Sequence, residues 1–98
     1  MTEPDPGFDA HHPSGQLLFR TCRGGYLHSV RLGEDAPAAD VRALADGVLL
    51  TAQVSHLRAV MEIRREIIGA GFTPSGDVPT PAELERAEAE LAAHRLEG

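Results

Sequence analysis

The chain has 98 residues, a net charge of −6 and one cysteine. A chain of this length makes one small domain, and a single cysteine excludes an intrachain disulfide. The negative charge argues against non-specific attraction to DNA or to an anionic membrane. Since we also see no signal peptide and no apolar run long enough for a bilayer, we expect a cytoplasmic protein with no membrane contact.

The first residues, 1–14, are rich in Pro, Asp, Gly and His and show no apolar period. We therefore expect a disordered tail there. About 80 residues remain for a core, and a domain of that size buries only about 60% of its unfolded surface. Because such a domain is marginal alone, the composition favours a homodimer of two-layer α/β protomers.

Residues 15–72 are expected to form an antiparallel β-hairpin followed by a long helix, which is an α+β arrangement. In the hairpin, two runs of β-forming residues flank Gly24-Gly25, a pair that suits a two-residue type I′ turn. Such a turn fixes which residues lie opposite each other on the two strands. These expected pairs include Leu17 with Leu32, Phe19 with Val30, Thr21 with His28 and Cys22 with Leu27.

The long helix is predicted to begin after Asp40, a suitable N-cap, and to end near Ile68, where Gly69 and Gly71 follow. Its apolar residues fall into two nearly opposite sectors at 100° per residue. One hairpin cannot cover both sectors, so we expect the second to form a dimer or partner interface. The residues of this predicted interface are Leu50, Val54, Leu57, Met61 and Ile68.

A linker over residues 73–80 leads to a C-terminal acidic helix over residues 81–97. Thr80, Pro81 and Glu83 together form a strong helix-start pattern. The apolar stripe of this helix is narrow and consists of Leu84, Ala87 and Leu91. Two interpretations carry equal weight: the stripe binds a partner protein, or the helix packs back on its own domain.

No set of residues predicts an enzyme, a metal site or a cofactor. The five histidines lack HxxxH spacing, and no second cysteine gives CxxC. Cys22 is expected to be a small apolar strand residue, because His28 lies on the opposite face of the hairpin and cannot act as its base. His56 is expected to be half-buried with one nitrogen hydrogen-bonded.

One basic cluster stands out, on the predicted hairpin. It consists of Arg20, Arg23 and Arg31, and residues 16–33 contain no acid. The favoured interpretation is that the arginine stems cover sheet surface while their charged ends are solvated. The alternative is contact with nucleic-acid phosphates.

The order of hairpin, long helix and acidic helix resembles the EspD and EspH proteins associated with mycobacterial type VII (ESX) secretion. Three segments carry the resemblance, of which the last is the most distinctive: GQLLFRTCRGGYLHSVRL, LADGVLLTAQVSHLRA and PTPAELERAEAEL. The resemblance implies a non-catalytic cytosolic accessory or chaperone-like protein that binds other proteins, among them secretion substrates. Those relatives have a further strand before the hairpin, where this chain has a short tail.

The layout is also similar to the YbaB fold, a dimeric α/β module of bacterial nucleoid-associated proteins. This second resemblance lies in the arrangement of the elements, so it is better evidence for the fold than for the function. It implies DNA binding as the alternative function, through the same three arginines.

Overall fold

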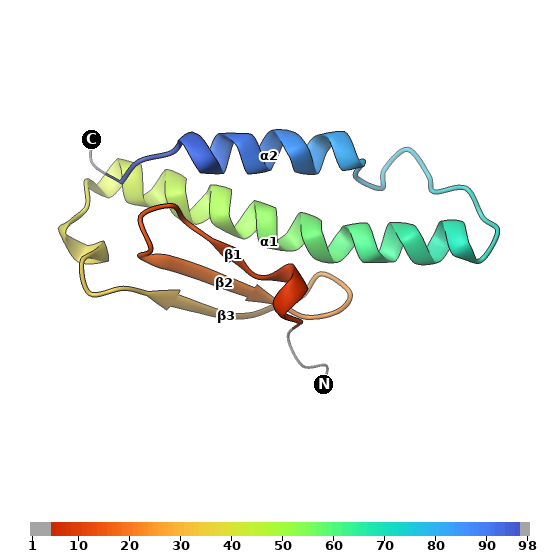
Figure 1. Ribbon diagram of the computed structural model, residues 1–98, viewed down its shortest axis with the longest axis horizontal. Helices are drawn as coiled ribbons and strands as arrows, with labels where there is room; N and C mark the ends of the chain where they lie inside the picture. The colour runs from red at the N-terminus through yellow and green to blue at the C-terminus, as the bar shows by residue number, and fades with distance from the viewer. Residues whose placement is uncertain (1–4, 97–98) are drawn as a thin grey trace.

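The computed structural model describes residues 5–96 and shows a three-stranded antiparallel sheet, a long helix and a shorter C-terminal helix (Figure 1). The strands lie in the order β1-β2-β3, so β3 is an edge strand. This confirms the predicted α+β fold with hairpin, long helix and C-terminal helix. The elements are η1 (Pro6–Phe8), β1 (Ala10–His11), β2 (Leu17–Thr21), β3 (Leu27–Leu32), η2 (Ala36–Ala38), α1 (Val41–Gly69) and α2 (Pro81–Ala93).

The prediction of a disordered tail over residues 1–14 is wrong for residues 5–14, while residues 1–4 lie outside the described part. Asp5 caps the 3₁₀ turn η1 by accepting from the Gly7 N–H at 2.8 Å. Phe8 and Ala10 then become buried, and β1 pairs with β2. The further strand before the hairpin is therefore present. The segment folds because tertiary contacts bury its few apolar side chains.

The hairpin register is confirmed along most of its length, with a correction near the turn. Leu17 lies opposite Leu32 and Phe19 opposite Val30, as predicted. A bulge then shifts the pairing, so that Thr21 lies opposite Leu27. The predicted pairs Thr21–His28 and Cys22–Leu27 are wrong because the turn is longer than two residues. Its glycines, residues 24 and 25, do take the predicted positive φ angles, of 94° and 88°.

Helix α1 begins and ends where the sequence predicts. The Asp40 carboxylate accepts from the Ala43 N–H at 3.0 Å, which satisfies one of the free donors at the helix start. At the other end, Gly71 takes a φ of +90°. The N–H groups of Gly71 and Phe72 each donate to a carbonyl in the last turn, at 3.0 Å. This is the Schellman arrangement, which stops a helix at a glycine.

Helix α2 starts with the predicted capping box. The Thr80 hydroxyl accepts from the Glu83 N–H, the Glu83 carboxylate accepts from the Thr80 N–H, and Pro81 occupies the first position. The helix ends at Ala93, earlier than the predicted 97, and residue 97 itself lies outside the described part. Beyond it the chain is extended, and the Leu96 carbonyl accepts from the Asp40 N–H at 3.3 Å.

Helix α1 is the central element of the fold, with the sheet on one side and α2 on another (Figure 1). Its two apolar sectors are therefore largely covered within the same chain. The molecule measures 49 × 28 × 16 Å. One core cluster joins β1, α1 and α2, and it contains Ala10, Val54, Leu57, Ala87 and Leu91, with Leu50 and Leu84 packed against it.

Candidate functional site

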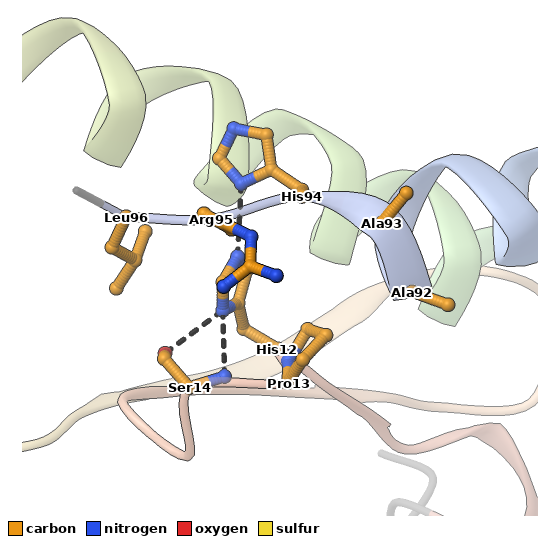
Figure 2. Close-up of a pocket in the computed structure, with 8 residues that line it drawn as sticks. All are labelled: His12, Pro13, Ser14, Ala92, Ala93, His94, Arg95 and Leu96. Carbon is orange, nitrogen blue, oxygen red and sulfur yellow. Dashed lines mark hydrogen bonds between the residues drawn. The ribbon is translucent and has the colours of Figure 1, made fainter. Parts of the chain in front are cut away.

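Two histidines from opposite ends of the chain meet beside the start of α1 (Figure 2). His12 follows β1 and His94 follows α2, and the His12 Nε2 lies 2.9 Å from the His94 Nδ1. Both rings also pack on Gly47 of α1, where an added Cβ would lie 3.3 Å from a carbon of each ring. We call His12, Ser14 and His94 the histidine cluster. It ties both ends of the chain to the central helix.

Hydrogen bonds fix the proton positions in the histidine cluster. The Ser14 backbone N–H donates to the His12 Nδ1 at 3.0 Å, so that nitrogen carries no proton. The proton of the neutral ring therefore sits on Nε2 and is donated to His94. Burial, and secondarily the nearby His94, lower the pKa of His12 below its ordinary value. Folding therefore favours the neutral form of His12.

The cluster lies beside a cavity of about 300 Å³, which invites comparison with a catalytic site. The Ser14 Oγ is 2.8 Å from the His12 Nδ1. A serine next to a histidine base, with a third group that orients the base, is an arrangement used in nucleophilic catalysis. Here, however, the Ser14 amide already occupies the His12 lone pair, and the Ser14 Oγ accepts from the Gln16 N–H at 3.1 Å. These bonds close the turn between β1 and β2.

The remaining histidines and the cysteine do not join this cluster. Among residues 5–96, no three His, Cys, Asp or Glu side chains lie close enough together to hold a metal ion. His56 is more exposed than predicted, but its Nδ1 does lie 2.9 Å from the Gly25 carbonyl. Cys22 is buried, with 3% of its surface exposed, which agrees with a small apolar core residue. Sequence spacing could not reveal the cluster, because His12 and His94 are 82 residues apart.

The predicted interface on α1 is wrong for most of its residues. Val54, Leu57 and Met61 are at most 5% exposed. Val54 and Leu57 belong to the core cluster that joins α1 to β1 and α2. Leu50 packs against the same core, and of the five residues Ile68 alone is mainly exposed, at 53%. The sector exists as predicted, but its partner is the chain itself.

The C-terminal helix packs on its own domain, which decides between the two interpretations left open by the sequence. Ala87 and Leu91 are buried and Leu84 packs against the same core, so this stripe is not a free partner-binding surface. Arg58 of α1 pairs with Glu88 of α2 at 2.9 Å, and Arg64 donates to the Pro79 carbonyl. These contacts also hold the linker before α2 to α1.

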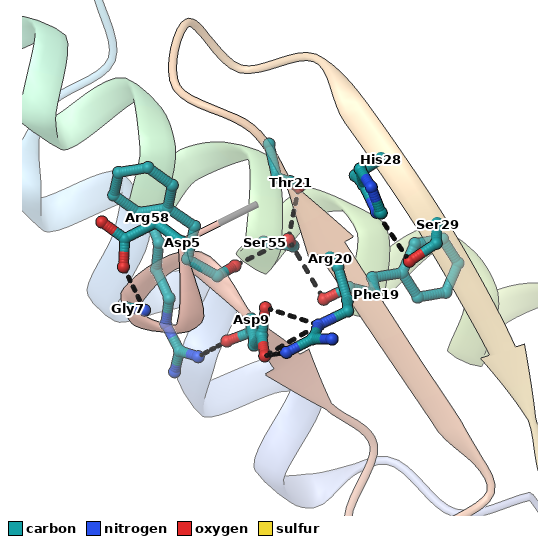
Figure 3. A network of polar contacts seen from close by, with 11 residues as sticks. Asp5, Gly7, Asp9, Phe19, Arg20, Thr21, His28, Ser29, Ser55 and Arg58 are labelled. Atoms are coloured by element: carbon teal, nitrogen blue, oxygen red, sulfur yellow. Dashed lines mark hydrogen bonds and ion pairs between the residues drawn. The ribbon is translucent and has the colours of Figure 1, made fainter. Parts of the chain in front are cut away.

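The basic cluster of the hairpin is largely neutralised by acids of the same chain. Arg20 pairs with Asp9 at 3.2 Å (Figure 3), and Arg23 pairs with Glu66. For Arg31 we find no ion-pair partner within residues 5–96. The three arginines therefore do not form one free cationic surface.

Buried polar groups link the N-terminal segment to the sheet and to α1 (Figure 3). Ser55 of α1 donates to the Phe8 carbonyl at 2.7 Å, and its hydroxyl lies 2.5 Å from that of Thr21. Ser55 and Thr21 are at most 2% exposed. The network positions the sheet on α1 and leaves none of its side-chain polar atoms without a partner.

Besides Val41 and Leu49 of α1, exposed apolar side chains gather in two regions, and of their residues only Ile68 belonged to the predicted interface. One is the edge strand β3 with the turn before it, where Tyr26, Leu27, Val30 and Leu32 are 42–74% exposed. The other is the end of α1, residues 67–72, which we call the projecting end. Arg23 of the hairpin turn reaches only to Glu66, and Figure 1 shows α1 running on past the sheet.

Comparison with known proteins places the chain in a family. No solved structure matches it. Uncharacterized protein Mb0029 of Mycobacterium bovis and uncharacterized protein Rv0028 of Mycobacterium tuberculosis are each 53% identical to it over 96 residues, which cover 98% of this chain and 95% of the relative. A family model described as "Protein of unknown function (DUF2694)" matches residues 1–97, so the chain belongs to the DUF2694 family.

Proposed function

We propose that this protein is a non-catalytic accessory that binds another protein through its projecting end. The observation that carries the proposal is the exposure of two large apolar side chains there, Ile68 at 53% and Phe72 at 71%. Both lie beyond the ion pair of Glu66, where neither the sheet nor α2 covers α1. Exposed apolar residues grouped at one end of a domain are typical of a binding surface.

The fitting partner is an amphipathic helix with basic residues beside its apolar face. A helix end has no free strand edge, so contact there must come from side chains, as when an apolar helix face docks on a partner. The net charge of −6 of the whole chain favours long-range attraction of a basic partner segment, while residues 62–66 beside the projecting end carry two arginines and two glutamates. The Schellman stop holds Phe72 at a fixed place after the helix, which limits the entropy lost on binding.

The class of partner is supported by resemblance alone. The likeness to EspD and EspH proteins favours secretion-associated proteins, including secretion substrates of a type VII system, as partners in the cytoplasm. No helix among residues 5–96 is long and apolar enough to cross a membrane. We do not propose DNA binding, because two of the three hairpin arginines that were expected to contact phosphates form ion pairs within the chain.

Site-specific photocrosslinking in a mycobacterial host tests this function. A photoreactive phenylalanine at position 72 should crosslink one discrete protein, whereas the same residue at the exposed Ala82 of α2 should not. The crosslinked protein, once purified, should bind the wild-type chain and lose at least tenfold in affinity with Ile68→Ser plus Phe72→Ser. Gln53→Ser, at an exposed polar position of α1, is the matched control. Unchanged affinity of the double variant would refute the proposal.

A further inference from the structure

We infer that β3 is a homodimerisation strand, which pairs antiparallel with β3 of a second copy so that the two Val30 residues lie opposite each other. The two three-stranded sheets would then form one six-stranded sheet. The predicted homodimer is thereby assigned to a surface other than the one on α1 that the sequence favoured. This interface is separate from the projecting end.

The edge strand has few of the features that normally prevent strand pairing. Edge strands in monomeric proteins usually carry charged residues, especially lysine, or proline, inward-pointing charges or β-bulges. The sequence of β3, LHSVRL, contains no lysine and no proline; its one charged residue is Arg31, and the bulge lies at the turn end of the strand pair. Leu27 is 59% exposed, Val30 42% and Leu32 60%, because α1 packs mainly on β2 and β1.

Hydrogen bonding in the hairpin shows which backbone groups of β3 are available. The Gly33 N–H donates to the Gln16 carbonyl at 2.7 Å. In an antiparallel pair, hydrogen-bonded and non-bonded positions alternate, so Ser29 and Arg31 direct their backbone groups to β2. Val30 and Leu32 direct theirs away from β2. A second strand would meet these outward N–H and C=O groups.

Charge excludes one of the two-fold arrangements that these groups allow, and apolar contact favours the axis at Val30, near the middle of the strand. A two-fold axis at Arg31 would place two arginines directly opposite each other, which is unfavourable. An axis at Val30 places Arg31 opposite Ser29 of the second copy. It also joins Val30 and Leu32 of both copies into one apolar strip next to Phe19, on the side of the sheet that faces α1.

A second copy suits this strand because the hairpin brings no acidic side chain to the contact, and two of its three arginines are already paired with acids of their own chain. Each chain carries −6, yet residues 16–33 contain no acid. Two molecules can therefore approach through β3 with their acidic regions apart. A pairing of six residues from each copy is a small interface, so we expect a dimer that dissociates in the micromolar range.

Charged substitutions at position 30 test the pairing and its register together. Val30→Lys and Val30→Glu should each be monomeric by sedimentation velocity, because like charges would face each other across the axis. An equimolar mixture of the two should recover dimer. Arg31→Glu faces Ser29 in this register, so it is the matched control and should remain dimeric. Circular dichroism of each variant verifies folding.

Each outcome decides the proposal. A wild-type chain that stays monomeric at several hundred micromolar overturns it. A dimer that persists in Val30→Lys places the interface elsewhere, and a mixture that stays monomeric refutes the register. If either single variant fails to fold, Val30→Thr against Val30→Pro replaces the pair. The N–H of residue 30 points away from β2; threonine keeps this donor and proline removes it. Only Val30→Pro should therefore weaken the dimer, by at least tenfold.

Discussion

Replacing Gly47 with alanine tests whether the two ends of the chain close on α1 as tightly as the structure shows. An added Cβ would lie 3.0 Å from the Leu96 Cδ2 and 3.3 Å from a ring carbon of both His12 and His94. In an open helix interior, glycine to alanine stabilises by about 1 kcal/mol. At this position the tight contacts should reverse the sign.

The magnitude follows from how freely the neighbours can move. The His12 ring is held by hydrogen bonds at both nitrogens, and one of these bonds also holds the His94 ring, so neither ring can shift without losing a bond. Forcing a methyl into a packed site costs about 1–3 kcal/mol. After subtraction of the helix-propensity gain, we expect Gly47→Ala to lower the free energy of unfolding by up to about 2 kcal/mol.

Urea denaturation at pH 7.5 and one protein concentration measures this effect. Gly69→Ala, in the same helix, is the matched control, since its Cβ would have no atom within 4 Å. It should leave stability unchanged or raise it by up to about 1 kcal/mol. If Gly47→Ala stabilises the chain as much as Gly69→Ala, the close approach of His12, His94 and Leu96 to α1 is refuted.

Four further predictions concern the core and the histidine cluster. Burial lowers the folded-state pKa of His12, so the unfolded chain binds a proton at this ring more readily than the folded chain does. The contribution of His12 to the free energy of unfolding is therefore complete above the unfolded pKa of 6.5 and is lost as the pH falls through 6.5 towards the folded pKa. The loss is at most about 1.4 kcal/mol per pH unit. Urea midpoints measured from pH 8 to pH 5 should show this fall, and His12→Gln should reduce it. Ser55→Ala should cost about 1–3 kcal/mol, because the buried Thr21 hydroxyl loses its partner, and a double-mutant cycle should show a smaller cost in a Thr21→Val background. Leu91→Ala should lower the free energy of unfolding by about 2–5 kcal/mol, because it leaves a cavity between α1 and α2. Deletion of residues 77–98 should unfold the chain, and a truncated chain that is folded by circular dichroism would contradict this.

The elements that the sequence predicts well are those whose signals are local. The Asp40 cap, the Thr80 capping box and the glycines after α1 depend on backbone groups within a few residues, and each lies where predicted. The hairpin register is also local in origin. It fails only beyond Arg20, where a bulge changes the pairing.

Features that depend on tertiary contacts could not be predicted from the sequence. Strand β1 has two residues, too few for any periodicity, and Ala10 is buried only because β2 and α1 surround it. The narrow stripe of α2 left open whether the helix packs on its own domain or binds a partner, and the structure shows Ala87 packed into the core against α1. The sequence identified the second apolar sector of α1 correctly and assigned it the wrong partner.

The covering of that sector by α2 changes how binding experiments on this protein must be designed. Since α2 belongs to the core, its deletion cannot separate a binding defect from unfolding. Apart from Val41 and Leu49 of α1, the large apolar side chains that stay exposed in residues 5–96 lie at two separate places, β3 with the turn before it and the projecting end. Neither place contains a residue of the core cluster. Substitutions at Val30 should therefore change self-association without affecting partner crosslinking at Phe72. Coupling between the two would mean that one surface forms only when the other is occupied.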